Sequence, residues 1–356
     1  MRQRLIDEMS VADYRDLARS EMYDWSPKEI EAWIHTGGGI IGQDAAVKAA
    51  ALTVYNHYEG RPSVSLFIGP TGSGKTEIWR TLQKEYRDHN IVIVDASTLT
   101  AEGWKGSNKL STIFRAMDSD SRRRRVILVL DEADKIMEPV YGGSGTNYNE
   151  LVQNQLLRLC DHDTIFFGCD DGSASGKELS VDCSNVSVVM LGAFAKLYDK
   201  KANDSRRIGF GTGSSGNHTP EKPPEITVED LIGYGMRAEL AGRINRIVCL
   251  DPLTVRDMAR IGQAETERLS EVLHRPVKIS PDALLMIGRM AQRQGLGARW
   301  VKSRIGQIID EMIYEDPTAP EYVVEYEPPD ADEMRQAECQ IIRQKDLSDT
   351  VNNPVM

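Results

Sequence analysis

The segment GPTGSGKT, residues 69–76, combines residue types that bind phosphate. It matches the pattern G-x-x-x-x-G-K-[ST] in full, follows an apolar run and precedes a helical pattern. Glycines let backbone N–H groups curve around phosphate oxygens, and a helix N-terminus behind them adds partial positive charge. We therefore expect Lys75 to contact the β and γ phosphates of ATP and the Thr76 hydroxyl to ligate Mg²⁺. The other expected nucleotide-binding residues of this loop are Gly69, Pro70, Thr71, Gly72, Ser73 and Gly74.

Two adjacent acids end a second apolar run, VILVLDEAD, residues 126–134. Acid pairs that follow strands often only cap the next helix. In a chain that also carries the phosphate loop, however, they indicate the second half of an ATP site. We expect Asp131 to hold Mg²⁺ together with Thr76, and Glu132 to orient and polarise the water that attacks the γ-phosphate. The predicted reaction is the hydrolysis of Mg-ATP.

The elements that must position these residues are strands alternating with helices over residues 26–250. Their apolar runs are continuous, which is typical of strands buried on both faces of a parallel sheet. This pattern predicts an α/β fold, a parallel sheet flanked by helices. Beyond it the patterns are helical, so we expect a smaller, mainly helical domain over residues 251–330. Residues 1–25 are expected to be an N-terminal extension and residues 331–356 a charged tail.

Composition narrows the classes of protein that fit. The 356 residues carry a formal net charge of -11, which gives no support to binding nucleic acid or membranes through bulk charge. No run approaches the roughly 18 apolar residues of a membrane span. The first thirty residues lack an apolar signal core, and the five cysteines include no C-x-x-C pair. A cytoplasmic protein without a zinc module or a disulfide framework is expected.

Further segments occur in a fixed order along residues 26–305: IIGQ, TVYNHY, GPTGSGKT, LDEADKI, LGAF, IGFG, EDLIGYGM, RAELAGRINRIV and GLGARW. Together they resemble the ClpX/HslU branch of AAA+ protein unfoldases, and most closely the ATPase part of ClpX without its N-terminal zinc domain. The resemblance implies an AAA+ P-loop NTPase large domain followed by a small helical lid domain. It also implies a homo-hexameric ring whose nucleotide sites lie between subunits.

The resemblance assigns roles to residues outside the two ATP motifs. Arg243 matches the arginine finger, which reaches the γ-phosphate bound by a neighbouring subunit. The alternative is that Arg243 simply makes a surface pair. Arg299 matches the sensor that touches the nucleotide of its own chain, and Ile41 matches a residue that packs near the adenine, although it could equally belong to the core. The nearby Arg237 and Arg246 are expected to make only surface pairs.

Two more segments match parts that act on other proteins. Trp104 occupies the aromatic position of the loop that grips substrate in the ring's pore, with Lys105 where an apolar residue is usual. The tripeptide Ile208, Gly209, Phe210 matches the loop that docks into apolar pockets of a ClpP-type peptidase ring. The alternatives are that Trp104 packs beneath a turn and that the tripeptide folds back onto its own domain.

Other features carry no assignment. The end of the strand near Met190 and Leu191 is apolar where many AAA+ proteins have a polar sensor, so no sensor is named there. The run SRRRR, residues 121–125, is interpreted as a solvated helix end or a contact between subunits. The segment DHD, residues 161–163, is interpreted as a polar turn rather than a metal site.

The leading hypothesis is an ATP-dependent protein unfoldase that feeds substrates, with or without an adaptor, to a ClpP-type peptidase. A stand-alone protein-remodelling chaperone with the same motor is the nearest alternative. An AAA+ motor directed at nucleic acid is a third and less favoured one, because the chain is acidic.

Overall fold

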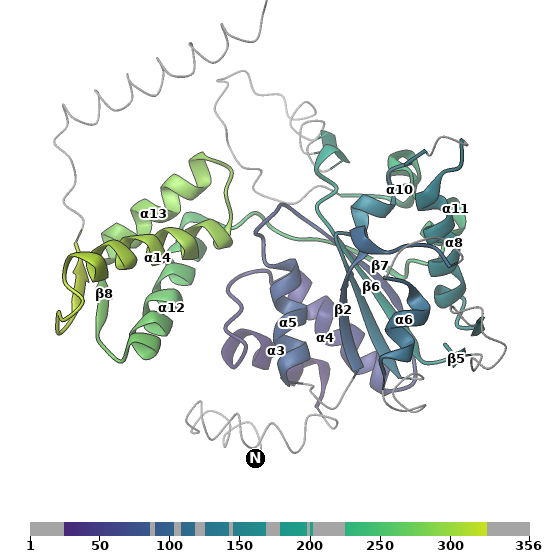
Figure 1. Cartoon of the computed structure of the whole chain (residues 1–356), viewed down its shortest axis with the longest axis horizontal. Helices are drawn as coiled ribbons and strands as arrows, with labels where there is room; N and C mark the ends of the chain where they lie inside the picture. Colours follow the sequence, from purple (N-terminus) through teal and green to yellow (C-terminus); the bar gives the residue numbers. More distant parts are fainter. Residues whose placement is uncertain are drawn as a thin grey trace, which may run out of the picture.

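The computed structural model describes residues 25–85, 90–102, 108–117, 125–141, 145–168, 179–197, 200–201 and 225–325. Within them, a parallel sheet with helices on both faces is followed by a group of helices that lies to one side (Figure 1). This arrangement confirms the predicted α/β class with a smaller, mainly helical part after it. The predicted pore residues Trp104 and Lys105 and the predicted docking residues Ile208, Gly209 and Phe210 lie outside the described residues.

Five strands form the sheet in the order β2-β3-β6-β1-β7, and all neighbouring strands are parallel. Every residue of β1 and β6 is buried, because both faces of these central strands are covered by helices. Strands β1 and β3 flank β6, so their carboxyl ends meet at one edge of the sheet. The strands are β1 (Val64–Ile68), β2 (Asn90–Asp95), β3 (Val126–Asp131), β6 (Val186–Gly192) and β7 (Arg246–Cys249).

Helices α3 (Pro27–Thr36), α4 (Asp44–Tyr58) and α5 (Lys75–Glu85) cover one face of the sheet. Helix α3 begins at a capping box in which Ser26 and Glu29 each accept from the other's backbone N–H. The core beneath these helices includes an edge-on contact between Phe67 and Trp79, with ring centroids 5.7 Å apart.

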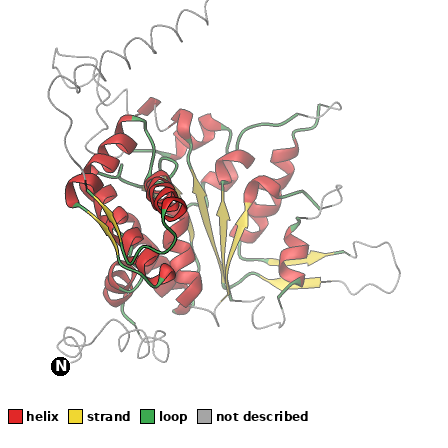
Figure 2. Ribbon diagram, turned by 60° about the vertical axis from the view of Figure 1, so that its left-hand side comes forward, coloured by secondary structure: helices red, strands yellow, loops and turns green. Residues whose placement is uncertain are grey.

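The opposite face carries further helices and a second core. They are η2 (Ala96–Thr98), α6 (Leu110–Arg115), η3 (Ala133–Ile136), α8 (Tyr148–Cys160), α10 (Val228–Tyr234) and α11 (Ala238–Ala241). An antiparallel pair, β4 (Thr164–Phe167) and β5 (Leu179–Asp182), adjoins them and lies at the right of Figure 2. Sequence reasoning missed this pair because its strands are only four residues long.

The remaining described residues form what we call the small domain, with a core of its own. It consists of α12 (Val255–Leu273), β8 (Val277–Ile279), α13 (Pro281–Arg293), α14 (Ala298–Glu315) and β9 (Tyr322–Val324). The three helices match the predicted patterns closely. The short parallel pair β8–β9 was not predicted. No helix among the described residues combines the length and apolar character needed to cross a membrane.

His57, on α4, is a buried titratable group in the large core. Its side chain is 1% exposed, and its Nδ1 lies 3.0 Å from the hydroxyl of Ser187 on β6. The same hydroxyl accepts from the backbone N–H of Ser63 at 3.2 Å. Burial, aided by the charge of Arg125, lowers the pKa of His57 from 6.5 to about 4. The native state therefore holds this imidazole neutral at neutral pH.

This burial predicts that the protein loses stability in weak acid. Between pH 6.5 and about 4 the unfolded chain binds a proton at His57 that the native state does not, so the free energy of unfolding falls as pH falls. From pH 7 to pH 5 the loss is about 2 kcal/mol. Denaturant titrations at both pH values should show that His57→Asn removes this difference.

The matched control is His274→Asn, an exposed residue in the left-handed conformation that asparagine tolerates. It should keep the pH dependence of the natural chain. An unchanged pH dependence in His57→Asn would contradict the assignment to His57.

Candidate nucleotide-binding site

The phosphate loop joins the end of β1 to the start of α5, as its sequence predicts. Gly72 and Gly74 adopt φ values of +79° and +100°, which favour glycine, and they let the chain turn tightly into the helix. Lys75 lies at the first turn of α5, where its Nζ donates to the carbonyl oxygens of Gly69 at 2.7 Å and Pro70 at 2.9 Å. The lysine is thereby held inside the curve of the loop.

Lys75 is a buried cation, and its surroundings change its pKa. Burial lowers its pKa from 10.5 to about 8, while the carboxylates of Asp131 and Asp134 oppose the shift and the charge of Arg299 adds to it. The hydroxyl of Ser73 in the same loop is buried without a hydrogen-bond partner among the described residues. A phosphate group would provide the anion and the acceptor that these two side chains lack.

The expected Mg²⁺ ligands Thr76 and Asp131 come from different elements and meet across β6. Thr76 Oγ1 donates to Asp131 Oδ2 at 2.9 Å. A hydroxyl and a carboxylate oxygen beside a phosphate loop are the donor set that Mg²⁺ takes in phosphate sites, so the residues present fit this ion.

Glu132 follows Asp131 in a left-handed conformation, with φ 55° and ψ 35°. Its backbone N–H donates to Asp131 Oδ1 at 3.0 Å. A non-glycine residue in this region of backbone space is strained, and such strain concentrates at functional sites. The geometry brings Asp131 and Glu132 to the same sheet edge as the phosphate loop.

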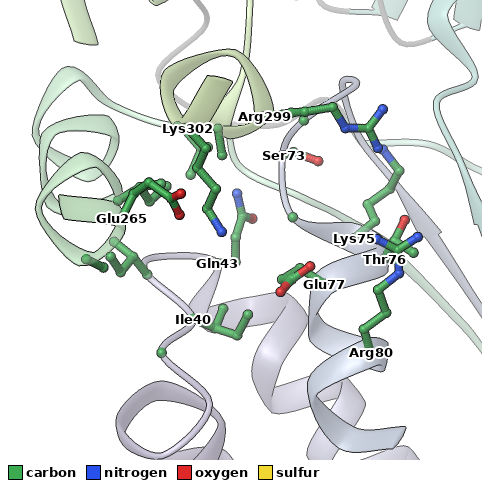
Figure 3. Close-up of a pocket in the computed structure, with 18 of the residues that line it drawn as sticks. Ile40, Gln43, Ser73, Lys75, Thr76, Glu77, Arg80, Glu265, Arg299 and Lys302 are labelled. Atoms are coloured by element: carbon green, nitrogen blue, oxygen red, sulfur yellow. The ribbon is translucent and has the colours of Figure 1, made fainter. Parts of the chain in front are cut away.

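The small domain contacts the phosphate loop through backbone. The N–H of Ala298, at the start of α14, donates to the carbonyl oxygen of Gly72 at 3.1 Å. A Cβ on Gly297 would lie 2.7 Å from the Gly72 backbone, so no side chain fits between the two segments. This contact places Arg299, one residue later, on the same side of the pocket as Lys75 (Figure 3).

A cavity of about 300 Å³ extends from the phosphate loop between the large and small domains (Figure 3). Ile40 and Ile41 line it, and so do the loop residues Gly72 to Thr76 and Arg299. Apolar side chains, among them Ile40, Ile41 and Ile261, line it together with the phosphate loop, which suits a purine base whose phosphates reach Lys75. The cavity thus joins most of the predicted nucleotide residues in one site.

Gln43 is a lining residue that sequence reasoning missed. Its amide donates to the carbonyl oxygen of Asp251 at 2.7 Å and accepts from the Asp251 N–H at 3.0 Å. Asp251 belongs to the segment that connects the sheet to the small domain. The IIGQ segment is therefore tied to this connection as well as to the pocket.

The small domain contributes three further charged residues that sequence reasoning missed. Glu265, on α12, is buried and receives three hydrogen bonds from the guanidinium of Arg268, at 2.6 to 3.1 Å. Lys302 extends into the pocket between Glu265 and Gln43 (Figure 3). Lys302 lies one helical turn after Arg299, a spacing that could have indicated it; nothing in the sequence distinguishes Glu265.

Near the carboxyl end of β6, Met190 and Leu191 are both fully buried. Asp134 is buried, and its Oδ1 accepts from the backbone N–H of Ala193 at 3.3 Å. The acidic segment after β3 is thus linked to the end of β6 by a carboxylate–backbone contact.

Arg243 lies far from the phosphate loop of its own chain. It precedes β7, whose first residue, Arg246, is paired with Ser65 at the amino end of β1. The phosphate loop leaves the carboxyl end of β1, so a full strand length of about 15 Å separates the two edges. Arg243 instead forms an ion pair with Asp161, 2.6 Å from Nε to Oδ1.

The other two arginines of this segment have local partners. Arg237 pairs with Glu150 at 3.2 Å and with Glu239 at 3.1 Å. Arg246 donates to the carbonyl oxygen of Ala49 at 3.3 Å. Arg237 thus makes the surface pairs predicted for it, whereas the contact of Arg246 is with part-buried backbone of α4.

Comparison with known proteins identifies the class. The family model described as AAA domain (Cdc48 subfamily) matches residues 61–247, more than half of the chain. The chain belongs to this family of ATPases.

Relatives specify the kind of AAA+ protein. The chain is 28% identical over 326 residues to the "ATP-dependent Clp protease ATP-binding subunit ClpX" of Treponema denticola, covering 82% of this chain and 78% of that protein. It is 27% identical over 363 residues to "ATP-dependent Clp protease ATP-binding subunit ClpX 3" of Methylococcus capsulatus, covering 87% and 82%. The chain is a ClpX-like AAA+ ATPase, as the sequence motifs predicted.

The backbone contact between Gly297 and Gly72 predicts a steric test of the site. In Gly297→Ala the added methyl group meets the Gly72 backbone, so α14 must shift and carry Arg299 away from the loop. Overpacking of this kind costs about 1–3 kcal/mol, so we expect ATP to bind about tenfold more weakly or worse in a fluorescent-nucleotide titration.

Gly306→Ala is the matched control, because Gly306 lies in the same helix with no atom within 4 Å of an added Cβ. It should bind ATP as the natural chain does. Equal ATP affinity of Gly297→Ala and Gly306→Ala would show that the small domain does not need this contact to form the site.

Proposed function

We propose that this chain is an ATP-dependent protein unfoldase and translocase that assembles into a homo-hexameric ring and feeds substrates to a ClpP-type peptidase. The printed names of its relatives, ATP-binding subunits of the Clp protease, support the kind of work done. The single observation that supports assembly into a ring is the distance of Arg243 from the phosphate loop of its own chain.

The pocket residues suit attack of water on the γ-phosphate of ATP. Lys75 and Arg299 supply positive charge to the phosphates, while Thr76 and Asp131 would hold Mg²⁺, which neutralises phosphate charge when bound. The Glu132 carboxylate orients the water and accepts its proton. The water oxygen bonds to the γ-phosphorus as the bond to the β-phosphate oxygen breaks, and the products are ADP and phosphate.

Arg243 completes the chemistry only from another chain. Its side chain is 53% exposed, and it sits at the opposite edge of the sheet from the acids of its own chain. An arginine that stabilises charge on the transferring phosphoryl group must approach that group directly. A ring in which each Arg243 reaches the nucleotide of the next chain meets this requirement for every subunit.

Two inactive variants should restore each other's activity if the sites are shared. Glu132→Gln keeps the phosphate contacts but loses the group that activates water, and Arg243→Ala loses the finger. Each alone should lower kcat about a hundredfold or more. In mixed rings an Arg243→Ala chain has an intact Glu132 and can receive Arg243 from a Glu132→Gln neighbour, so ATPase activity should reappear.

The measurement is the ATPase rate of each variant alone and after joint reassembly. Both variants should still bind ATP. A mixture no more active than the sum of its parts would argue against sites shared between chains.

The parts that act on proteins are proposed from the sequence. Trp104 and Lys105 would line the pore and grip the translocating chain by shape and apolar area. Ile208, Gly209 and Phe210 would plug into apolar pockets on the peptidase ring. Several such weak contacts per ring would add through avidity.

Replacing Ile208 and Phe210 by Ala should abolish degradation of a tagged substrate by the ring and a ClpP-type peptidase, because the apolar anchors are lost. ATP hydrolysis and peptidase-independent unfolding should stay unchanged. Ser214→Ala with Ser215→Ala, in the same segment, is the matched control. Normal degradation by the Ile208 and Phe210 variant, or no peptidase binding by the natural chain, would instead favour the stand-alone remodelling function.

A further inference from the structure

We propose that Asp161 is the positioning residue for Arg243: it holds the Nε of the guanidinium so that the two terminal nitrogens face the neighbouring chain's nucleotide. This inference rests on the proposed function of Arg243 as a finger acting between chains. Asp161 belongs to the DHD segment, which by sequence alone is only a polar turn.

The ion pair between Arg243 and Asp161 involves only one of the three guanidinium nitrogens. Arg243 Nε lies 2.6 Å from Asp161 Oδ1. Within the described part of the chain, neither terminal nitrogen of Arg243 has a hydrogen-bond partner. The carboxylate therefore attracts the guanidinium at its Nε through an ion pair, while it leaves free the terminal donors that can bind two phosphate oxygens.

Asp161 stands where an acid is otherwise unfavourable. It caps the carboxyl end of α8, and its backbone N–H donates to the carbonyl oxygen of Leu157. The carboxyl end of a helix carries partial negative charge, which repels a carboxylate. A nearby cation offsets this repulsion, and Arg243 provides that cation.

Helix α8 connects the two edges of the sheet. Near its start, the Asn149 amide donates to the carbonyl oxygens of Lys135 at 2.8 Å and Glu138 at 2.7 Å, just after the acids of the ATP site. Its thirteen residues span about 20 Å and end beside Arg243. The helix thus has one end at the nucleotide acids of its own chain and the other at the finger.

Gln153, in the same helix, forms hydrogen bonds that hold the backbone of the segment before Arg243. It is buried, its amide donates to the carbonyl oxygen of Ile136 at 3.0 Å, and its Oε1 accepts from the Arg237 N–H at 2.8 Å. Arg237 begins α11, which packs on α8 and ends just before Arg243. Gln153 therefore sets the backbone position, and Asp161 sets the direction of the side chain.

Loss of Asp161 should leave the fold and the backbone of Arg243 in place. Asp161→Asn removes a carboxylate from a position where the helix dipole disfavours it, so the protein should not become less stable. The guanidinium would then sample several rotamers, and a finger misplaced by about 1 Å can cost about a hundredfold in rate. We expect kcat for ATP to fall about tenfold to a hundredfold with the KM unchanged.

The test uses the full chain in mixed rings, because the proposed effect acts across subunits. In mixed rings of Arg243→Ala and Glu132→Gln chains, activity should reappear at sites where a Glu132→Gln chain supplies Arg243 to an Arg243→Ala neighbour. Adding Asp161→Asn to the Glu132→Gln chain should abolish this recovery. Adding Asp161→Asn to the Arg243→Ala chain should leave the recovery intact, because that chain donates no finger.

Asp163→Asn is the matched control, an exposed acid two residues away. Placed in either chain, it should not change the recovered ATPase rate. Thermal unfolding of each variant reports whether a loss of activity reflects loss of fold.

Three results would overturn the inference. They are a normal or raised kcat in Asp161→Asn rings, an equal loss of recovery whichever chain carries Asp161→Asn, and a loss accompanied by lower stability. Failure of the proposed function gives a different result. In that case Arg243→Ala rings keep a normal kcat, or the first mixture without Asp161→Asn shows no recovery, and both ideas fall together.

Discussion

The common direction of the five parallel strands is the constraint on which the rest of the structure depends. Because all strands run the same way, every loop that follows a strand emerges at one edge, and every segment that precedes a strand lies at the other. The phosphate loop and Glu132 follow strands and Asp131 ends one, whereas Arg243 precedes one. The strand direction that brings Lys75, the metal ligands and Glu132 together around ATP therefore keeps Arg243 away from them.

Burial on both faces makes this arrangement possible and also sets its electrostatics. The central strands exclude water, so Lys75 and Asp134 at their ends sit in a region of low polarity, and each depends on close partners. Lys75 is satisfied by loop carbonyls and Asp134 by a backbone N–H. Charged groups that are already desolvated and oriented need little reorganisation when charge develops on a phosphate.

The sequence predicted the parts whose signals are local. Continuous apolar runs marked β1, β3 and β6, helical periodicity marked α12 to α14, and the glycine pattern marked the phosphate loop. It did not predict the pair β4–β5, whose strands are too short for a clear pattern, or Gln43, Glu265 and Arg268. These three residues line the cavity because the small domain packs beside the phosphate loop, and no local spacing encodes that packing.

The meeting of Gly72 and Gly297 has a consequence for how this chain can change in evolution. A Cβ on either residue would strike main-chain atoms of the other, rather than a side chain that could be made smaller. No substitution at one position can therefore compensate for a substitution at the other. The two positions, more than two hundred residues apart in sequence, are constrained jointly, because at this point the two domains meet backbone against backbone.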